Sequence, residues 1–139
     1  MGLVNETIEI RALPEDVWAV AGDPGRIGEW VPALAGSIPV DEGRACTLQD
    51  GAEILERVLE HSDDGRYYVS EITSSPLPLR SHTSRLSVHG HGNHSHVNWV
   101  AQFEAESPDL EPELVQQFGR IYREGLATLR ERVEVDAST

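Results

Sequence analysis

Hydrophobic and polar residues alternate with a period of two along most of the chain, which is typical of strands with one buried face. The first such segment is VNETIEIRA, in which Val4, Ile8 and Ile10 are candidates for the buried side. Turn-forming residues separate the segments that follow Pro32. We therefore predict further strands at 34–40, 43–48, 52–61, 66–74, 79–90 and 95–105.

Two regions have helical features instead. The segment LPEDVWAVAGDP carries Pro14 and two acidic residues in its first turn and Gly22 near its end, which predicts a short helix. A second short helical piece is expected at 23–30. Residues 110–133 repeat apolar positions every three or four residues, which predicts one long amphipathic helix with a stripe formed by Leu114, Phe118, Ile121, Tyr122, Gly125, Leu129 and Val133.

The order of these elements predicts an α+β fold. Consecutive strands joined by short turns form an antiparallel sheet, and a lone long helix must bury its stripe against that sheet. We expect a helix-grip fold, in which a curved seven-stranded sheet surrounds the C-terminal helix after two short helices. A single domain would span 1–135, with a frayed tail at 136–139. A sheet curved around one helix leaves room for a cavity.

The composition limits the classes of molecule that the chain is expected to bind. The formal net charge of −13 disfavours nucleic acid and anionic membrane surfaces, since both would repel the chain. The sequence has neither a recognisable signal peptide nor an apolar run long enough to span a membrane. Its single cysteine, Cys46, cannot form an internal disulfide and is expected to be a small core residue. We therefore expect a cytoplasmic monomer or homodimer.

Four histidines surround the dipeptide Gly92-Asn93 in the stretch VHGHGNHSHV. A two-residue turn there places His89, His91, His94 and His96 on one face of a hairpin, opposite an apolar face formed by Leu86, Val88, Val97, Trp99, Ala101 and Phe103. Four neighbouring imidazoles are able to chelate zinc or nickel, but no acidic residue lies nearby in sequence to orient them. We favour a solvated hairpin tip without a dedicated metal site, and leave a mild pH response open.

The same register places His82 and Ser84 on the inner face of the sheet. An inward histidine is either a satisfied core residue or an acid–base catalyst, and the polar neighbour Ser84 makes the second interpretation worth testing.

Glu56 has two possible orientations. If Ile54 and Val58 face the helix, Glu56 points inward; if Leu55 and Leu59 face it, Glu56 is a surface charge. Periodicity alone does not decide between them. An inward carboxylate is costly when unpaired, so the inward orientation predicts a contact with a cation, a hydroxyl, water or a ligand.

Several segments resemble the SRPBCC group of the START/Bet v 1 superfamily, in particular its small polyketide cyclase/dehydrase-like proteins. They are ERVLEHSDDGRYYVSEITSSPLPLRSHTSRLSV, PEDVWAVAGDPGRIGEWVPAL, WVAQF and IYREGLATL. The resemblance covers nearly the whole chain and implies a helix-grip fold whose sheet and helix enclose a cavity. It also implies that the cavity is lined by the positions matching Glu56, His82, Ser84 and Trp99.

The sequence departs from this pattern in three places. His82 stands where relatives often carry a tyrosine, and Val31 stands where they often carry a histidine. Pro32 replaces the lysine that anchors a ligand carboxylate in the plant abscisic-acid receptors. The resemblance therefore implies no catalytic role for Val31 and a ligand other than abscisic acid.

We expect a cavity protein for a mostly apolar small molecule, acting as a cofactor-free cyclase, dehydratase or isomerase. His82 would be the general acid/base, and Glu56 would orient it or stabilise charge. Trp30 would either pack the short helices or wall the cavity mouth. Ligand contacts are expected from Ser84, Trp99, Trp30, Tyr68, Phe103, Phe118 and Tyr122. The alternatives are a carrier or sensor that uses the same cavity, and an interaction module that uses its acidic surface.

Overall fold

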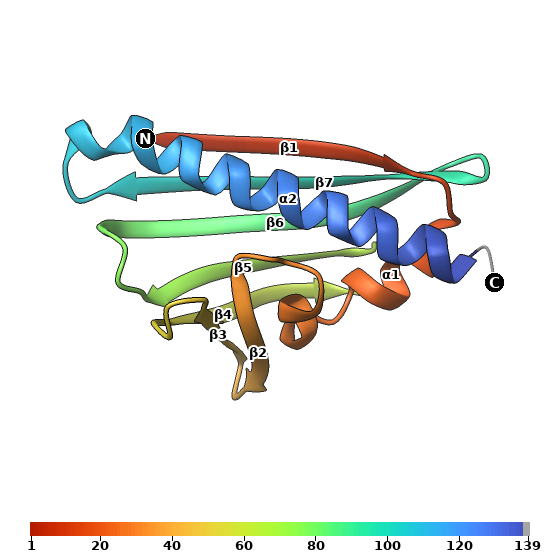
Figure 1. The fold of residues 1–139 in the computed structure, drawn as a ribbon, viewed down its shortest axis with the longest axis horizontal. Helices are drawn as coiled ribbons and strands as arrows, with labels where there is room; N and C mark the ends of the chain where they lie inside the picture. Colours follow the sequence, from red (N-terminus) through yellow and green to blue (C-terminus); the bar gives the residue numbers. More distant parts are fainter. Residues whose placement is uncertain (138–139) are drawn as a thin grey trace.

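A seven-stranded antiparallel sheet curves around one long helix in the computed structural model, which describes residues 1–137 (Figure 1). The strand order is β1-β7-β6-β5-β4-β3-β2, so the chain meanders from β2 to β7 and β1 pairs with β7. The elements are β1 (Gly2–Ile10), α1 (Pro14–Ala21), the 3₁₀ helix η1 (Pro24–Glu29), β2 (Leu34–Val40), β3 (Gly43–Leu48), β4 (Glu53–Ser62), β5 (Tyr67–Ser74), β6 (Leu79–His91), β7 (His94–Ala105), the 3₁₀ helix η2 (Pro108–Leu110) and α2 (Glu111–Ala137). This architecture confirms the predicted helix-grip fold.

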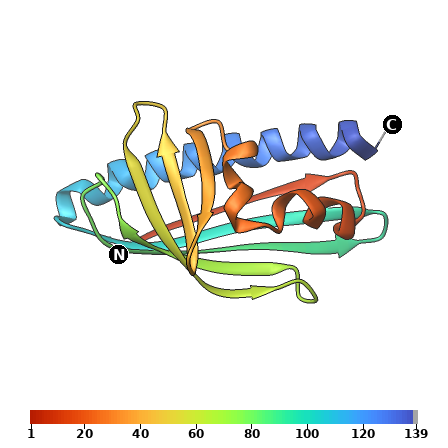
Figure 2. The same cartoon turned by 90° about the horizontal axis from the view of Figure 1, so that it is seen from below.

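The long helix α2 lies along β1, β7 and β6, while β2 and β3 run at a steep angle to that part of the sheet (Figures 1 and 2). Bulges account for much of this curvature, since an extra residue in one strand bends it and increases its twist. The pairing of β4 with β5 shifts in register at Leu55/Glu56, where β5 has the extra residue, and at Val58/Glu60, where β4 has it, and the pairing of β6 with β7 shifts at Leu79/Ser81. The buried core fills the space between α2 and the concave face of the sheet.

The predicted second helical piece is a 3₁₀ helix, η1. Its six residues begin with a proline and include two glycines, a composition that favours a short, tight turn over an α-helix. Ser37 of β2 fixes it, because the Ser37 hydroxyl donates to the Gly25 carbonyl at 2.9 Å and accepts from the Gly28 amide at 2.8 Å. The segment between α1 and β2 is thereby held against the sheet.

The histidine hairpin has the predicted register. His89 pairs with His96 and His91 with His94 around a turn in which Gly92 has a φ of 64°, a conformation that favours glycine. The face opposite the imidazoles is buried, as predicted. An acidic neighbour that the local sequence does not contain comes from β1: Glu9 lies 3.3 Å from His94 Nδ1 and 3.3 Å from His96 Nε2.

The C-terminal helix extends beyond its predicted end at 133 and continues to Ala137. The predicted stripe faces the sheet, with Leu114, Phe118 and Tyr122 buried. Of the predicted tail at 136–139, residues 138–139 lie outside the described part of the chain. No helix within residues 1–137 combines the length and apolar character needed to cross a membrane.

Gly43 is required by the close approach of β3 and β4, whereas Gly36 is not confined. A Cβ atom at Gly43 would lie 1.9 Å from the Glu56 carbonyl oxygen, while one at Gly36 would meet no atom within 4 Å. Gly43→Ala should therefore lower the free energy of unfolding by about 1–3 kcal/mol, the usual cost of overpacking. Gly36→Ala should leave it unchanged or slightly higher in urea titrations. Equal stabilities of the two variants would contradict this explanation.

Candidate functional site

A cavity of about 80 Å³ lies between the concave face of the sheet and α2. Most of its wall is apolar, and half-buried side chains such as Leu34, Leu77 and Ile121 mark its mouth. The lining comes from η1 and the segment after it, from β2 to β7 and from α2: Ile27, Val31, Ala33, Leu34, Arg44, Leu48, Ile54, Glu56, Ile72, Leu77, His82, Ser84, Trp99, Gln117, Phe118, Ile121 and Tyr122. The space is small in comparison with an engineered apolar cavity of about 150 Å³ that binds benzene.

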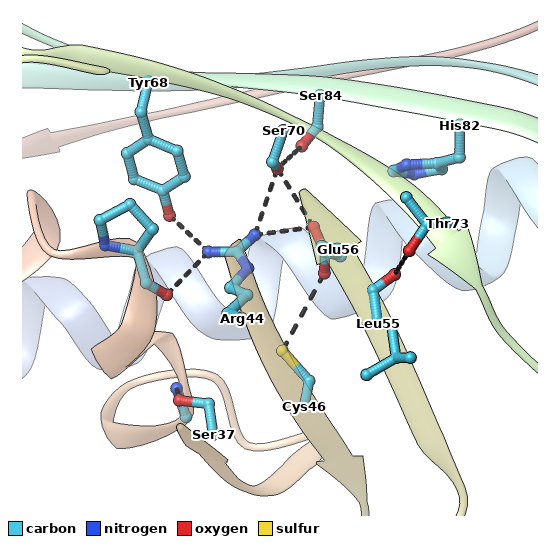
Figure 3. Close-up of polar contacts among 12 residues, drawn as sticks. Ser37, Arg44, Cys46, Leu55, Glu56, Tyr68, Ser70, Thr73, His82 and Ser84 are labelled. Carbon is cyan, nitrogen blue, oxygen red and sulfur yellow. Dashed lines mark hydrogen bonds and ion pairs between the residues drawn. The ribbon is translucent and has the colours of Figure 1, made fainter. Parts of the chain in front are cut away.

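A row of polar side chains crosses the inner face of the sheet at one end of this cavity. Arg44 of β3 is the direct cross-strand partner of Glu56 of β4, and Ser70 of β5 is the partner of Ser84 of β6. Ser70 joins the two pairs, because its hydroxyl donates to Glu56 Oε1 at 3.1 Å and lies 3.4 Å from the Ser84 hydroxyl (Figure 3). Four strands therefore contribute to one connected polar cluster, which we call the Arg44 cluster.

The centre of the Arg44 cluster is a buried ion pair. Arg44 Nη2 donates to Glu56 Oε1 at 2.9 Å, and the two side chains are only 2% and 13% exposed. Arg44 uses its remaining amino hydrogens on the carbonyl of Pro24 at 3.1 Å, the hydroxyl of Tyr68 at 2.9 Å and the hydroxyl of Ser70 at 3.4 Å. Glu56 thus points inward, and the cation expected beside an inward carboxylate is Arg44.

Each charge of the pair keeps the other ionised. Burial opposes ionisation of both groups, but the Glu56 carboxylate outweighs it and raises the pKa of Arg44 above its ordinary value. The Arg44 guanidinium likewise outweighs burial and holds the pKa of Glu56 below its ordinary value. Glu56 is therefore a permanent anion near neutral pH and does not exchange protons there.

His82 of β6 faces the same cavity and is 4% exposed. Burial lowers the pKa of its imidazole, and the negative charge of Glu56 offsets this only in part, so the ring is neutral near pH 7. Nε2 of His82 lies 3.2 Å from the Tyr122 hydroxyl, whose pKa is raised by burial. Nδ1 of His82 is buried and has no hydrogen-bond partner among the described residues. Its ring lies on the same side of the sheet as Glu56 and Ser84 (Figure 3).

Aromatic side chains close the cavity at its α2 side. The rings of Trp99 and Tyr122 stack with centroids 3.8 Å apart, and Trp30 packs against Trp99 at 5.4 Å. Gly125 permits this packing, since a Cβ atom there would lie 3.2 Å from Val31 and 3.4 Å from Trp99. The space that Gly125 leaves is thus used for close packing of aromatic and aliphatic side chains.

The structure brings most of the predicted site residues together. Six of them line the cavity: Glu56, His82, Ser84, Trp99, Phe118 and Tyr122. Three do not. Trp30 packs behind Trp99, Tyr68 hydrogen-bonds Arg44, and Phe103 stacks on His82 at a centroid distance of 6.2 Å. These three residues support the lining from outside, so the expectation that they contact a ligand directly has no geometric support.

Arg44 and Ser70 of the Arg44 cluster, and Gln117 of α2 in the cavity wall, are polar residues of the site that the sequence did not lead us to expect. A signal for Arg44 was available: Cys46 was expected in the core, and a period of two places Arg44 on the same face of that strand. Folding 43–48 onto 52–61 about the turn at Gln49-Asp50-Gly51 would also have placed Arg44 opposite Glu56. Ser70 has no comparable signal, because a serine is common on either face of a strand.

Other chemistry receives little support from the site. Among residues 1–137, no group of three or more His, Cys, Asp or Glu side chains is arranged to hold a metal ion. Burial raises the pKa of the Cys46 thiol to about 11, so the thiolate needed for nucleophilic attack is rare. The sequence contains no lysine, so no side-chain amine is available to form a Schiff base.

Comparison with known proteins places this arrangement in a family. Residues 1–134 match the family described as "Polyketide cyclase / dehydrase and lipid transport". Among curated protein sequences, none matches the chain significantly.

Solved structures with the same fold are similar to this chain. The protein XoxI from Bacillus cereus is 29% identical with a TM-score of 0.90, and the match covers 100% of this chain and 99% of that one. A START superfamily protein from Mycobacterium smegmatis is 16% identical with a TM-score of 0.78, over 96% of this chain and 98% of that one. The di-domain ARO/CYC BexL from the BE-7585A biosynthetic pathway is 15% identical with a TM-score of 0.84, over 100% of this chain and 48% of that one. Because the last two proteins are only 16% and 15% identical to this chain, their similarity shows a shared fold but not a shared function.

The buried ion pair should behave as a unit when it is mutated. Arg44→Met and Glu56→Gln should each lower the free energy of unfolding by about 3–5 kcal/mol, because each leaves an uncompensated buried group, whereas the double variant should be less destabilised than the sum of the two. Urea unfolding of the four proteins gives the coupling energy. Glu71→Gln is the matched control, because it breaks an exposed pair with Arg57 and should have little effect. Additive losses in the Arg44 and Glu56 variants would contradict the pairing.

The buried neutral His82 should make stability depend on pH. Its pKa is lowered by folding, so the stability it contributes is present above its ordinary value of 6.5 and is lost as the pH falls through the folded value. Arg44, Glu56 and Tyr122 surround it, and none of them titrates between about pH 7 and 5 given the directions of their pKa shifts. Wild-type protein should therefore lose more stability than His82→Gln between these pH values in urea titrations. Parallel losses would show that His82 is not held neutral.

Proposed function

Because the chain belongs to the polyketide cyclase/dehydrase and lipid transport family, we propose that it binds a hydrophobic small molecule in the cavity beneath α2 and converts it by cofactor-free acid–base chemistry. One observation carries the catalytic part of this proposal: the cavity wall contains a buried, neutral imidazole whose Nδ1 atom has no partner among the described residues. A neutral base held next to an apolar cavity is suited to accept a proton from a bound substrate.

His82 and the residues around it have different roles in the proposed reaction. In a dehydration, the imidazole takes a proton from the carbon next to a carbonyl group and returns it to the hydroxyl that leaves the neighbouring carbon as water. In an aldol-type cyclisation, the carbon that loses the proton bonds to a second carbonyl carbon, and the imidazolium gives the proton to that carbonyl oxygen. The anionic Glu56 stabilises the imidazolium that forms between these two steps, because it lies close enough to raise the pKa of His82. The Ser84 hydroxyl is placed to hold a substrate oxygen, and the apolar wall holds the chain or ring in a reactive conformation.

The small size of the cavity requires that it opens before a large ligand can bind. Pockets for drug-sized ligands measure about 300–1,000 Å³, whereas this cavity measures about 80 Å³. A ligand of polyketide size therefore needs the side chains at the mouth to swing outward. Leu34, Leu77 and Ile121 are half-buried and able to do so without breaking the Arg44 cluster.

A non-catalytic carrier or sensor is the second candidate. It is favoured by the state of Glu56, which is bound by Arg44 and by the Ser70 hydroxyl and does not exchange protons near neutral pH. Only one titratable group of the cavity is then free to act on a ligand, and a carrier needs none. The two candidates share the cavity and differ in whether the bound compound is changed.

Ligand capture tests the binding proposal. The purified protein is incubated with a lipophilic extract of the producing cells, washed, and its bound compounds are released and identified by mass spectrometry. Ser84→Leu should retain at least about tenfold less compound, because the larger side chain fills the cavity. Thr83→Leu is the matched control, since the neighbouring residue is exposed on the opposite face and should bind as the wild type does. Equal retention by the two variants would remove the cavity as the binding site.

The same experiment separates enzyme from carrier. In the enzyme, the compound recovered from wild-type protein differs in mass or structure from the compound added, and His82→Gln binds it unchanged. In the carrier, both proteins return the compound unaltered. Capture of no compound by wild-type protein would count against both candidates.

A further inference from the structure

We infer that the ligand presents an uncharged oxygen group, a hydroxyl or a carbonyl, to the polar end of the cavity, and that the site rejects carboxylates. This inference rests on the proposed function, because it specifies the chemical class of the ligand for that cavity. Two independent features of the site lead to it: the balance of buried charge, and the polar atoms left without partners.

The charges that line the cavity already cancel. Arg44 and Glu56 are the only permanently charged side chains in the wall of the cavity as described, and they bind each other at 2.9 Å. The Arg44 side chain is only 2% exposed and that of Glu56 13%, so water stabilises their charges little. A ligand carboxylate would add a second anion beside Glu56 without a cation of its own, and burying an unpaired charge is expensive.

Two nitrogen atoms at the polar end lack partners in the described chain. They are Nε of Arg44, which is a hydrogen-bond donor, and Nδ1 of His82, and both are inaccessible to bulk solvent. A buried polar atom without a partner costs roughly 1–3 kcal/mol, so a ligand oxygen that pairs with one of them gains affinity. A hydroxyl can donate or accept and a carbonyl can accept, and neither brings a charge.

Together these features predict a specific order of affinities. An apolar ligand leaves the two nitrogen atoms unpaired, whereas a carboxylate pairs with Nε of Arg44 but adds a charge. A neutral carbonyl accepts from Nε, and a hydroxyl can also donate to Nδ1 of His82, in both cases without adding a charge. Sites that contain buried hydrogen-bonding groups discriminate strongly against ligands that cannot pair with them. The ion pair thus makes the site selective for neutral ligands, although it contains a cation.

Three probes of the same ring size test this order: benzene, phenol and benzoate, at a pH near 7.5 where phenol is neutral and benzoate is charged. Binding is followed by titration in ¹H–¹⁵N NMR spectra, with the amide signals of Ser84 and Trp99 reporting on the cavity. This readout separates the cavity from the outer groove between β1 and α2, where Arg120 and Arg123 could attract benzoate. Phenol should bind about tenfold more tightly than benzoate and more tightly than benzene.

A charge-changing variant should abolish the preference for phenol over benzoate. Glu56→Gln leaves Arg44 without its counter-ion, so the affinity for benzoate relative to phenol should rise by about tenfold. Glu60→Gln, the same change at an exposed position of β4, is the matched control and should leave the order unaltered. Should Glu56→Gln fail to fold, the order of the three probes on wild-type protein decides the matter.

The outcomes distinguish the two proposals. If benzene, phenol and benzoate all leave the Ser84 and Trp99 signals unmoved, the cavity does not bind ligands and the proposed function fails. If benzene binds but benzoate equals or exceeds phenol, or phenol does not exceed benzene, the cavity stands and the inferred neutral oxygen group is wrong.

Discussion

The ion pair between Arg44 and Glu56 is the constraint on which the rest of the site depends. A guanidinium that is almost fully buried is tolerable only when its charge is matched, and Arg44 meets this condition through Glu56 of β4, while its two amino groups also bond to η1 and β5 and Nε alone has no partner among the described residues. Its bond to the Pro24 carbonyl fixes the start of η1, and η1 in turn supplies Ile27 to the cavity wall. The electrostatics of the sheet and the cover of the cavity are therefore set by one side chain.

The same pair determines what His82 can do. The imidazole makes its hydrogen bond to Tyr122, not to the pair, so the effect of the pair acts through space. Glu56 raises the pKa of His82 while Arg44 lowers it, and burial then has the larger effect. If Glu56 stood alone, the pKa of His82 would be higher, and a larger fraction of the imidazole would already carry the proton that a base must be free to accept. Because Glu56 is paired with Arg44, His82 stays an uncharged base, and the polar end of the cavity beside it has no net charge.

Sequence periodicity was sufficient for the fold but not for the cavity. The register of β6 and β7 followed from residues 82–103, because only one alignment buries Leu86 and Trp99 and also places Gly92 at the turn. The orientation of Glu56 stayed open, because both alternating sets of this segment contain apolar residues, Ile54 and Val58 on one face and Leu55 and Leu59 on the other. The volume of the cavity depends on how side chains of many elements pack, and no local pattern encodes it.

The six histidines show why residue type alone does not locate a site. The hairpin imidazoles are the most conspicuous feature of the sequence, yet they lie on the outer face, where water solvates them and Glu9 is their ionic neighbour. His82 has no histidine beside it in the sequence, but it is enclosed by Phe103, Phe118 and Tyr122, and its protonation responds to the buried charges. An imidazole becomes chemically distinctive through loss of water and through the partners that replace it. For this fold, the face of the strand on which a polar residue lies is therefore a better guide to function than the density of such residues along the chain.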